Sequence, residues 1–271
     1  MKVTDSEFLK NFTATCESSY QKGWNEANGG NMSYRIPIEE INDVWDDFNL
    51  DRPWTSIGVT VSNLAGEYFL VTGSGKYFKN TQKAPAENVC LIEINDTGTM
   101  YRIVWGLKNG GRPTSELPTH LLGHSVKLAT GSENRVILHN HPVHLIALTF
   151  VLPLNDRDFT RELWDMMPEC PVVIPRGIGV LEFMLTGSID IAIASAEKLR
   201  LYDAVVWAGH GIFCSAKTFD SAFGMVDTIE KASTALSLVL SMGGKKWRPS
   251  REQTMLLKSE YGFDVNESFF D

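Results

Sequence analysis

Cysteine is scarce in this sequence. The 271 residues include only four, Cys16, Cys90, Cys170 and Cys214, and no two of them form a C-x-x-C pair. This spacing indicates neither a thiolate zinc site nor a disulfide framework. No cysteine has a basic residue next to it in the sequence. We therefore expect reduced thiols that pack as small hydrophobic groups.

Excess positive charge and long apolar runs are also missing. Lysine and arginine number 25 against 33 acidic residues, which gives a net charge of −8. Such a chain does not attract nucleic acid or an anionic membrane surface, so it must bind any anion locally. No stretch approaches the roughly 18 apolar residues of a membrane span, and "MKVTDSEFLKNF" lacks the pattern of a signal peptide. We expect a cytoplasmic protein.

What is present suits one α/β domain over residues 1–271. Hydrophobic residues make up 43% of the chain, enough for a sizeable core. Stretches rich in β-branched and aromatic residues predict strands at "EYFLVT", "NVCLIEI", "TMYRIVWG" and "VILHNH", and "DAVVWAGHGIFCSA" predicts two strands around a glycine turn. Helices are predicted at "TGSIDIAIASAEKLR" and "TFDSAFGMVDTIEKASTALSLVLSMGG", and another after Pro118.

The first and last helices carry end signals. Residues 4–7, "TDSE", form a capping box, and apolar or aromatic residues then recur at every fourth position: Phe8, Phe12, Cys16 and Tyr20. Near the other end, Ser250 and Gln253 predict a helix start that Gly262 closes. The first helix is expected to be amphipathic.

Histidines are concentrated in one place. Three of only six, His139, His141 and His144, lie within "VILHNHPVHLIALTF", residues 136–150. On a strand, His139 and His141 point to the same face, which is a chelating geometry. By itself H-x-H is a weak signal, because ordinary packing explains most such pairs. His144 follows Pro142 at a helix start, so we interpret it as a capping group or a support for the ligands.

A better third ligand is His210 in "WAGHGIF". Glycines on both sides let the backbone approach closely, so that the imidazole can emerge from a tight turn. Three histidines with one open position are typical of catalytic rather than structural zinc.

The segment "RPTSELPTHLLGH" offers further candidates. Glu116 lies between a glycine-rich loop and a helix start. The helix dipole alone explains a carboxylate at such a position, and we favour this interpretation over a catalytic one for the residue taken by itself. His120 and His124, four residues apart, could form another ligand pair. A helix face packed under the sheet explains those two histidines better.

Two glycine-containing loops could hold a phosphate. "NGGN" at Asn28 to Asn31 and "TGSGK" at Thr72 to Lys76 supply small side chains, hydroxyls and exposed backbone N–H groups. Such nests suit an anion. Each is a weak signal alone, because glycine turns are common and neither loop has P-loop spacing.

Taken together, these motifs resemble the class II aldolase/adducin family. The resemblance runs almost end to end, through "KGWNEANGGNMSYR", "VTGSGKYFKN", "PTSELPTHLLGH", "VILHNHPVHLIALTF", "ECPVVIPRGIGVLEF" and "GHGIF". It implies an α/β fold, a single domain with a mainly antiparallel central β-sheet flanked by helices. Residues 38–66 would be an insertion relative to smaller relatives.

The resemblance also implies a site. Zn²⁺ would be held by His139, His141 and His210, with Glu116 beside it as a catalytic group. Glu169 matches a catalytic glutamate that a neighbouring subunit contributes, in a C4 homotetramer with active sites at the subunit interfaces. The substrate phosphate would be surrounded by seven residues with small or polar side chains: Asn28, Gly30, Asn31, Ser74, Gly75, Thr114 and Ser115.

The implied reaction is reversible cleavage of a ketose 1-phosphate through a metal-stabilised enediolate, which needs no Schiff-base lysine. Three alternatives compete with this reaction. A 4-epimerase or an aldolase for another sugar phosphate would use the same zinc, but the chain length and the insertion argue against the epimerase. A non-catalytic, adducin-like interaction domain would be expected to lose zinc ligands. A hydrolase would need an activated serine or cysteine, and "TGSGK" is not the G-x-S-x-G elbow.

Overall fold

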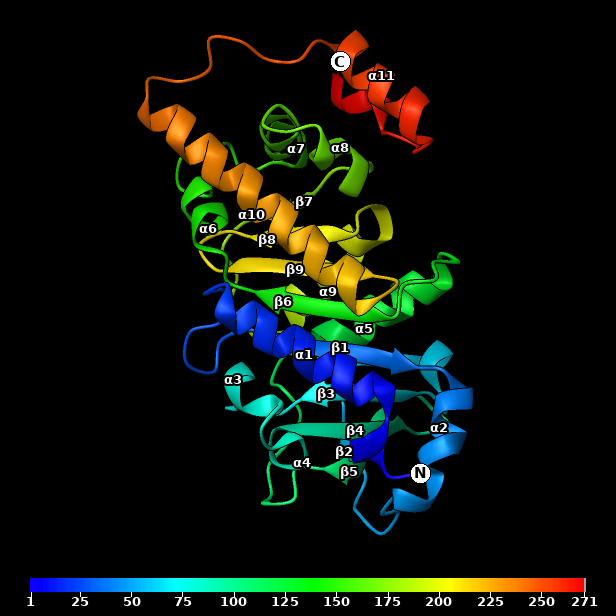
Figure 1. The fold of residues 1–271 in the computed structure, drawn as a ribbon. Coiled ribbons are helices and arrows are strands. Elements are labelled where there is room, and N and C mark those ends of the chain that lie inside the picture. Colours follow the sequence, from blue (N-terminus) through cyan, green and yellow to red (C-terminus); the bar gives the residue numbers. More distant parts are fainter. Residues whose placement is uncertain (271) are drawn as a thin grey trace.

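The computed structural model describes residues 1–270, and one β-sheet, built from strands between residues 31 and 216, forms its centre (Figure 1). Nine strands follow the order β2-β5-β4-β3-β1-β6-β9-β8-β7. All neighbouring pairs are antiparallel except β7 and β8. The mainly antiparallel sheet is thus confirmed. The strands are β1 (Asn31–Ile36), β2 (Thr55–Ser56), β3 (Tyr68–Thr72), β4 (Val89–Ile94), β5 (Met100–Gly106), β6 (Val136–Asn140), β7 (Gly179–Leu181), β8 (Ala204–Trp207) and β9 (Gly211–Ala216).

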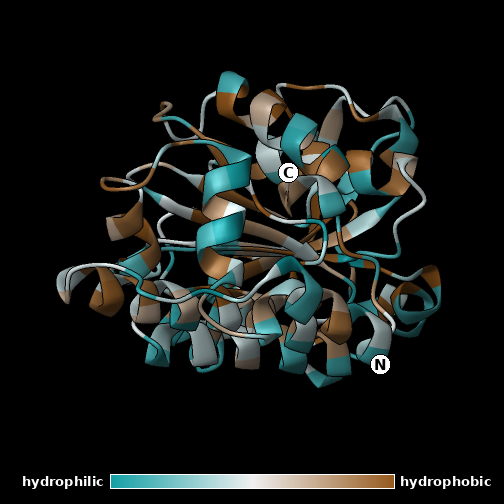
Figure 2. Cartoon of the chain, turned by 90° about the horizontal axis from the view of Figure 1, so that it is seen from above, coloured by the Kyte–Doolittle hydropathy of each residue, from teal (hydrophilic) through white to brown (hydrophobic). Residues whose placement is uncertain are grey.

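Helices cover both faces of the sheet (Figure 2). One face carries α1 (Glu7–Gln21), α2 (Ile38–Val44), α6 (Val143–Leu148), α7 (Asp156–Trp164), α8 (Glu169–Val173) and α10 (Phe219–Ser241). The other carries α5 (Leu117–Ala129) and α9 (Ile189–Leu201). Shorter or peripheral helices are α3 (Phe78–Thr81), α4 (Pro85–Asn88), α11 (Arg251–Tyr261), η1 (Val3–Asp5), η2 (Trp45–Asp47), η3 (Ser62–Leu64) and η4 (Glu267–Phe270).

The central strands are buried on both faces, and alternate residues enter different cores. Leu138 of β6 belongs to the large cluster beneath α1 and α10, whereas its neighbour Ile137 packs in the cluster beneath α5 and α9. Because side chains alternate along a strand, His139 points to the same side as Ile137. The His139 ring accordingly packs against Trp207, with ring centroids 4.7 Å apart.

Most predicted helix ends are confirmed, with one correction. The first helix begins at Glu7 because the Ser6 side chain accepts a hydrogen bond from the backbone N–H of Leu9, so the cap is Ser6 and not the predicted Thr4. Residues 3–5 instead form a separate 3₁₀ turn. At the other end, Ser250 and Gln253 form the predicted capping box, and Gly262 closes α11 with φ of 68°.

All four cysteines are buried and free, as expected. Residues 38–66 contain α2, η2, β2 and η3, and their status as an insertion stays a prediction. Across residues 1–270, the length and hydropathy needed to cross a bilayer are met by none of the helices.

A buried lysine ties the end of α5 to the start of β8. Lys127 is 1% exposed, and its Nζ donates to the Asp203 carboxylate and the Tyr202 carbonyl, both at 2.7 Å. Burial lowers the pKa of Lys127 and the facing carboxylate opposes that effect. The contact anchors the C-terminal end of α5, the helix that begins directly after Glu116.

We expect Lys127→Ala to lower the free energy of unfolding by about 2 kcal/mol, because it removes a buried side chain and its charged hydrogen bonds to Tyr202 and Asp203. Lys217 pairs with Glu133 at 2.8 Å on the surface and supplies the matched control. Lys217→Ala should leave stability unchanged, since exposed pairs contribute little. Urea unfolding of both variants provides the measurement, and equal losses would contradict the assigned role of Lys127.

Candidate metal centre and active site

Three histidines from two parts of the sheet meet at one end of β6. His139 is on β6, His141 follows the strand directly, and His210 lies in the turn between β8 and β9. The Nε2 atom of His139 lies 3.1 Å from that of His141 and 3.3 Å from that of His210. The sequence therefore identified three imidazoles that the fold does bring together.

Hydrogen bonds on the far side of two rings fix their tautomers. The Nδ1–H of His139 donates to the carbonyl of Ile212 at 2.8 Å. The Nδ1–H of His141 donates to the Glu26 carboxylate, also at 2.8 Å. A neutral imidazole that donates through Nδ1 presents a bare lone pair at Nε2, the state that a metal requires.

The three Nε2 atoms fit a divalent cation. Burial, followed by the charges of His141 and His210, holds the pKa of His139 well below its ordinary value. Burial chiefly lowers the pKa of His210 to about 4, so both rings are neutral near pH 7. Neutral lone pairs that face one another repel unless a cation lies between them. The ligand atoms of this group all lie within 4.8 Å of one another, and imidazole nitrogens suit zinc and other transition metals.

Glu116 lies beside this cluster. It directly precedes α5 but makes no capping hydrogen bond, so helix capping does not explain its position. Its Oε2 atom is 3.7 Å from Nε2 of His139 and accepts a hydrogen bond of 2.7 Å from the amide of Asn31. Burial raises the pKa of Glu116, while Asn31 and the charge of His141 oppose the shift. The carboxylate is placed to exchange a proton near the cation site.

A cavity of about 140 Å³ joins the histidines to the two glycine loops. Hydroxyl and amide groups dominate the part of its lining that lies away from the histidines. All seven predicted phosphate-site residues line the cavity, together with Glu116 and the three histidines: Asn28, Gly30, Asn31, Ser74, Gly75, Thr114 and Ser115. The tertiary structure thus gathers residues that lie up to 182 positions apart, from Asn28 to His210.

The first glycine loop passes directly against the histidine strand. A Cβ atom on Gly30, which has φ of +74°, would lie 2.7 Å from the carbonyl oxygen of His139. A Cβ on Gly29 would lie 2.9 Å from Cε1 of His141. Only glycine allows this approach of loop to strand.

The second glycine loop is tied to the segment before α5. The N–H of Ser74 donates to the Arg112 carbonyl at 2.9 Å, and the N–H of Thr114 donates to the Thr72 carbonyl at the same distance. These bonds place Ser74 and Thr114 side by side at the cavity. Because its N–H is occupied, Ser74 offers its hydroxyl to a ligand and not the backbone group expected from the sequence.

Glu169 does not join the site of its own chain. It is exposed at the start of α8 and does not line the cavity. His144 also lies elsewhere, at the start of α6, where its Nδ1 meets the Glu230 carboxylate at 2.8 Å. The backbone N–H groups of His144 and Leu145 donate to that same carboxylate, so Glu230 caps this helix start and the His144 side chain is not itself the capping group.

The packing interpretation of His120 and His124 is confirmed. Both are buried on α5 beneath the sheet, and both contact the Ser33 hydroxyl, at 2.7 and 2.8 Å. Neither belongs to the group of three histidines that could bind a metal.

Two site residues escaped the sequence analysis. Glu26 holds His141, and Thr186, from the segment before α9, lines the cavity. No local pattern distinguishes either residue from other polar loop positions. Their roles depend on contacts between segments that are far apart in the sequence.

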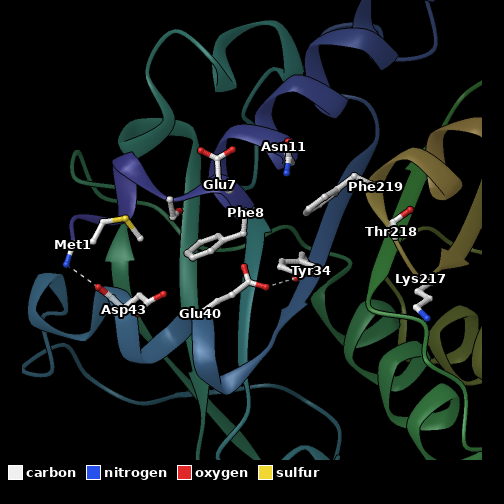
Figure 3. A pocket seen from close by; sticks show the side chains of 11 residues that line it. Met1, Glu7, Phe8, Asn11, Tyr34, Glu40, Asp43, Lys217, Thr218 and Phe219 are labelled. Atoms are coloured by element: carbon white, nitrogen blue, oxygen red, sulfur yellow. Dashed lines mark hydrogen bonds between the residues drawn. The ribbon is translucent and has the colours of Figure 1, made fainter.

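A larger cavity of about 450 Å³ lies away from this centre, between α1, α2 and the start of α10 (Figure 3). Aromatic rings of Phe8, Tyr34 and Phe219 line it, and the Tyr34 hydroxyl donates to Glu40 at 3.1 Å. It contains no convergent metal-binding nitrogens, and we assign the chemistry to the smaller, polar cavity.

Comparisons with known proteins agree with this geometry. A model of the Class II Aldolase and Adducin N-terminal domain matches residues 10–236. Rhamnulose-1-phosphate aldolase from Yersinia pestis (strain Pestoides F) is 43% identical over 264 residues, 97% of this chain and 96% of that one. The enzyme of the same name from Listeria monocytogenes serotype 4b (strain CLIP80459) is 39% identical over 99% and 98% of the two chains. A sugar-phosphate aldolase structure from Thermotoga maritima superposes with a TM-score of 0.72 at 28% identity, covering 88% and 97%.

We expect the purified protein to bind about one divalent cation per chain, because three imidazole ligands leave one position open for a further ligand. His139→Ala and His210→Ala should abolish stoichiometric binding, whereas His144→Ala should retain it. Elemental analysis after gel filtration measures the ratio. A loss of metal in His144→Ala equal to that in His139→Ala would show that the ligand set is wrong.

Proposed function

The chain belongs to the class II aldolase and adducin family, and on that basis we propose that it is a zinc-dependent rhamnulose-1-phosphate aldolase. The reaction is the reversible cleavage of L-rhamnulose 1-phosphate to dihydroxyacetone phosphate and L-lactaldehyde. One observation carries the proposal: three imidazole nitrogens and the Glu116 carboxylate converge in a cavity that is otherwise lined by hydroxyl and amide groups.

The metal and the carboxylate have complementary tasks. Cleavage of the C3–C4 bond leaves an electron pair on C3, which delocalises into the C2 carbonyl. Zn²⁺ bound by His139, His141 and His210 would supply the Lewis acidity that stabilises this charge. Glu116 returns a proton to C3 of the dihydroxyacetone phosphate half, and its buried position keeps competing water away. The lactaldehyde half requires a second base near the C4 oxygen.

The phosphate is bound without lysine. Asn28, Ser74 and Ser115 offer side-chain donors around the far part of the cavity, and Thr114 adds a hydroxyl. Asn31 has one amide proton left after its bond to Glu116. Neutral donors suit an anion that must lie close to a cation, because they add no competing positive charge. Gly30 and Gly75 let the backbone approach the phosphate closely.

The second base is Glu169 of a neighbouring copy in a C4 homotetramer. Glu169 is exposed and lies outside the cavity of its own chain. Apolar surface beside the site supports a subunit contact there: Phe150 and Phe183 are 77% and 78% exposed, and both rings lie next to Gly209, which precedes His210. Exposed aromatic groups of this kind mark protein–protein contacts.

The first test of the proposed function is a coupled assay of dihydroxyacetone phosphate release. L-Rhamnulose 1-phosphate should be cleaved with the higher kcat/KM, L-fuculose 1-phosphate more slowly, and a chelator should abolish both activities. Preferred cleavage of L-fuculose 1-phosphate, or epimerisation of a pentulose 5-phosphate without cleavage, would identify a different member of the family.

Substitutions in the phosphate site should affect binding more than chemistry. We expect Ser74→Ala and Asn28→Ala to raise KM by ~10-fold with little change in kcat, because these contacts persist from the bound substrate to the transition state. Steady-state kinetics on the zinc-loaded variants measure both constants. A loss confined to kcat would instead place these residues in the chemical step.

A half-reaction should distinguish the roles of Glu116 and Glu169. Exchange of the C3 proton of dihydroxyacetone phosphate with ²H₂O needs only the group that acts at C3. Glu116→Gln should therefore suppress both exchange and cleavage by about 100-fold or more, because general acid–base catalysis contributes ~10²–10⁴-fold to a rate. Glu169→Gln should suppress cleavage and leave exchange largely intact. Equal loss of exchange in both variants, with zinc and tetramer retained, would disprove this division of roles.

A further inference from the structure

Polar residues of α5 and β1 alternate in space beneath the metal centre. Glu116 precedes α5, and His120 and His124 follow it at intervals of four residues. Asn31 and Ser33 are two residues apart on β1. The hydrogen bonds connect them in the order Glu116, Asn31, His120, Ser33, His124. We call these five residues the α5–β1 network.

The alternation is possible because a four-residue step along α5 has nearly the same length as a two-residue step along β1. Four residues of an α-helix advance by about 6 Å and two residues of a strand by about 6.7 Å, so a helix lying along a strand keeps the same register over several steps. Each helix side chain can then lie between two strand side chains. A shift of the strand by one residue would turn Asn31 and Ser33 to the opposite face of the sheet.

The network is continuous and buried. Asn31 donates to Glu116 at 2.7 Å, and its side-chain oxygen contacts Nε2 of His120. Nδ1 of His120 lies 2.7 Å from the Ser33 hydroxyl, which lies 2.8 Å from Nε2 of His124. All five residues are at most 8% exposed.

The chemistry of the groups gives these bonds a direction. The Asn31 oxygen can only accept, so His120 must donate through Nε2–H. Burial lowers the pKa of His120 to about 3, so the ring is neutral and its Nδ1 is a bare acceptor. The Ser33 hydroxyl therefore donates to His120, and its oxygen accepts from Nε2–H of His124.

The far end of the network favours this direction. Nδ1 of His124 has no hydrogen-bond partner within residues 1–270. In the direction above, this atom is a bare lone pair packed near the Phe69 ring, with ring centroids 5.0 Å apart. In the reverse direction it would carry a buried N–H without an acceptor, and orphaned buried N–H groups are the rarer defect.

From this arrangement we propose that the α5–β1 network is a positioning device for catalysis. Asn31, His120, Ser33 and His124 hold the Glu116 carboxylate with Oε2 bound to the Asn31 amide, which leaves Oε1 to act on the substrate. Asn31 then orients Glu116 in addition to lining the phosphate cavity, and His120 and Ser33 act at a distance from any ligand. This inference rests on the proposed role of Glu116 at C3.

The direction can be tested without measuring activity. In the ¹⁵N-histidine-labelled, zinc-loaded enzyme, NMR should show His120 and His124 as neutral Nε2–H tautomers, with His120→Leu and His124→Leu identifying their signals. A Nδ1–H tautomer at either histidine would overturn the proposal. The tautomers are read from the spectrum of the unmodified protein, so one folded variant is enough to identify its histidine there, and a Nδ1–H tautomer at that histidine alone rejects the assigned direction.

Kinetics test the positioning itself. Ser33→Ala should lower kcat for cleavage and for C3 exchange by ~10-fold at unchanged KM and zinc content, the scale found when outer hydrogen-bond partners are removed. Ser215→Ala is the matched control, because Ser215 is also a buried strand serine but its hydroxyl has no hydrogen-bond partner within residues 1–270. Its kcat should not change. Equal effects of the two substitutions would reject the positioning role.

His120 allows a rescue experiment. His120→Leu should lower kcat by ~10–100-fold at constant zinc content, whereas His120→Gln should restore most of it, because an amide N–H can still donate to Asn31. Equal losses in both variants, with zinc retained, would overturn the proposal. If the unmodified enzyme cleaves neither sugar phosphate, the proposed function fails, and the NMR tautomers still decide whether the network has the assigned direction.

Discussion

The register of β6 between its two neighbours is the constraint on which the site depends. β6 pairs Asn31 with His139 on one side and His139 with Phe213 on the other. Antiparallel pairing therefore places the start of β1, the end of β6 and the start of β9 next to one another, on the side of the sheet where these strand ends meet the loops. Because side chains alternate, one register error would turn His139 from the α5 face into the opposite core.

The surrounding structure makes a locally unfavourable arrangement tolerable. Three imidazoles with facing lone pairs and a buried carboxylate would not assemble by themselves. They are held by bonds to groups that are fixed for other reasons: Ile212 is a strand residue, and Glu26 lies in the loop that Gly29 and Gly30 allow to approach the strand. Such local conflicts with folding rules are expected at functional sites.

Helix α5 connects stability to chemistry. Its first turn brings Glu116 to the three-histidine cluster, its middle carries His120 and His124 beneath β1, and its last turn is anchored by Lys127. The helix is therefore fixed at both ends by polar contacts while its apolar residues pack under the sheet. Precise placement of one carboxylate thus depends on contacts along the full length of the helix.

The sequence by itself determined those features that repeat within one element. The H-x-H spacing predicted two imidazoles on one side of the chain at the end of β6, and glycines around His210 marked a turn. Stretches rich in β-branched and aromatic residues located six of the nine strands, and end signals located the first and last long helices to within a few residues. The family resemblance then supplied the rest of the predicted site, and eleven of the twelve predicted site residues line one cavity. Local spacing suffices here because backbone geometry fixes the direction of neighbouring side chains.

Only the tertiary structure decided which elements meet. It assigned Glu26 to His141, the Asn31 amide to Glu116 and the Ser33 hydroxyl to two histidines, and it moved the first helix cap from Thr4 to Ser6. It also left Glu169 outside the cavity of its own chain. The contacts of Glu26, Asn31 and Ser33 join residues that lie 85 to 115 positions apart. Such pairs follow from strand register and helix placement, which no local sequence pattern encodes.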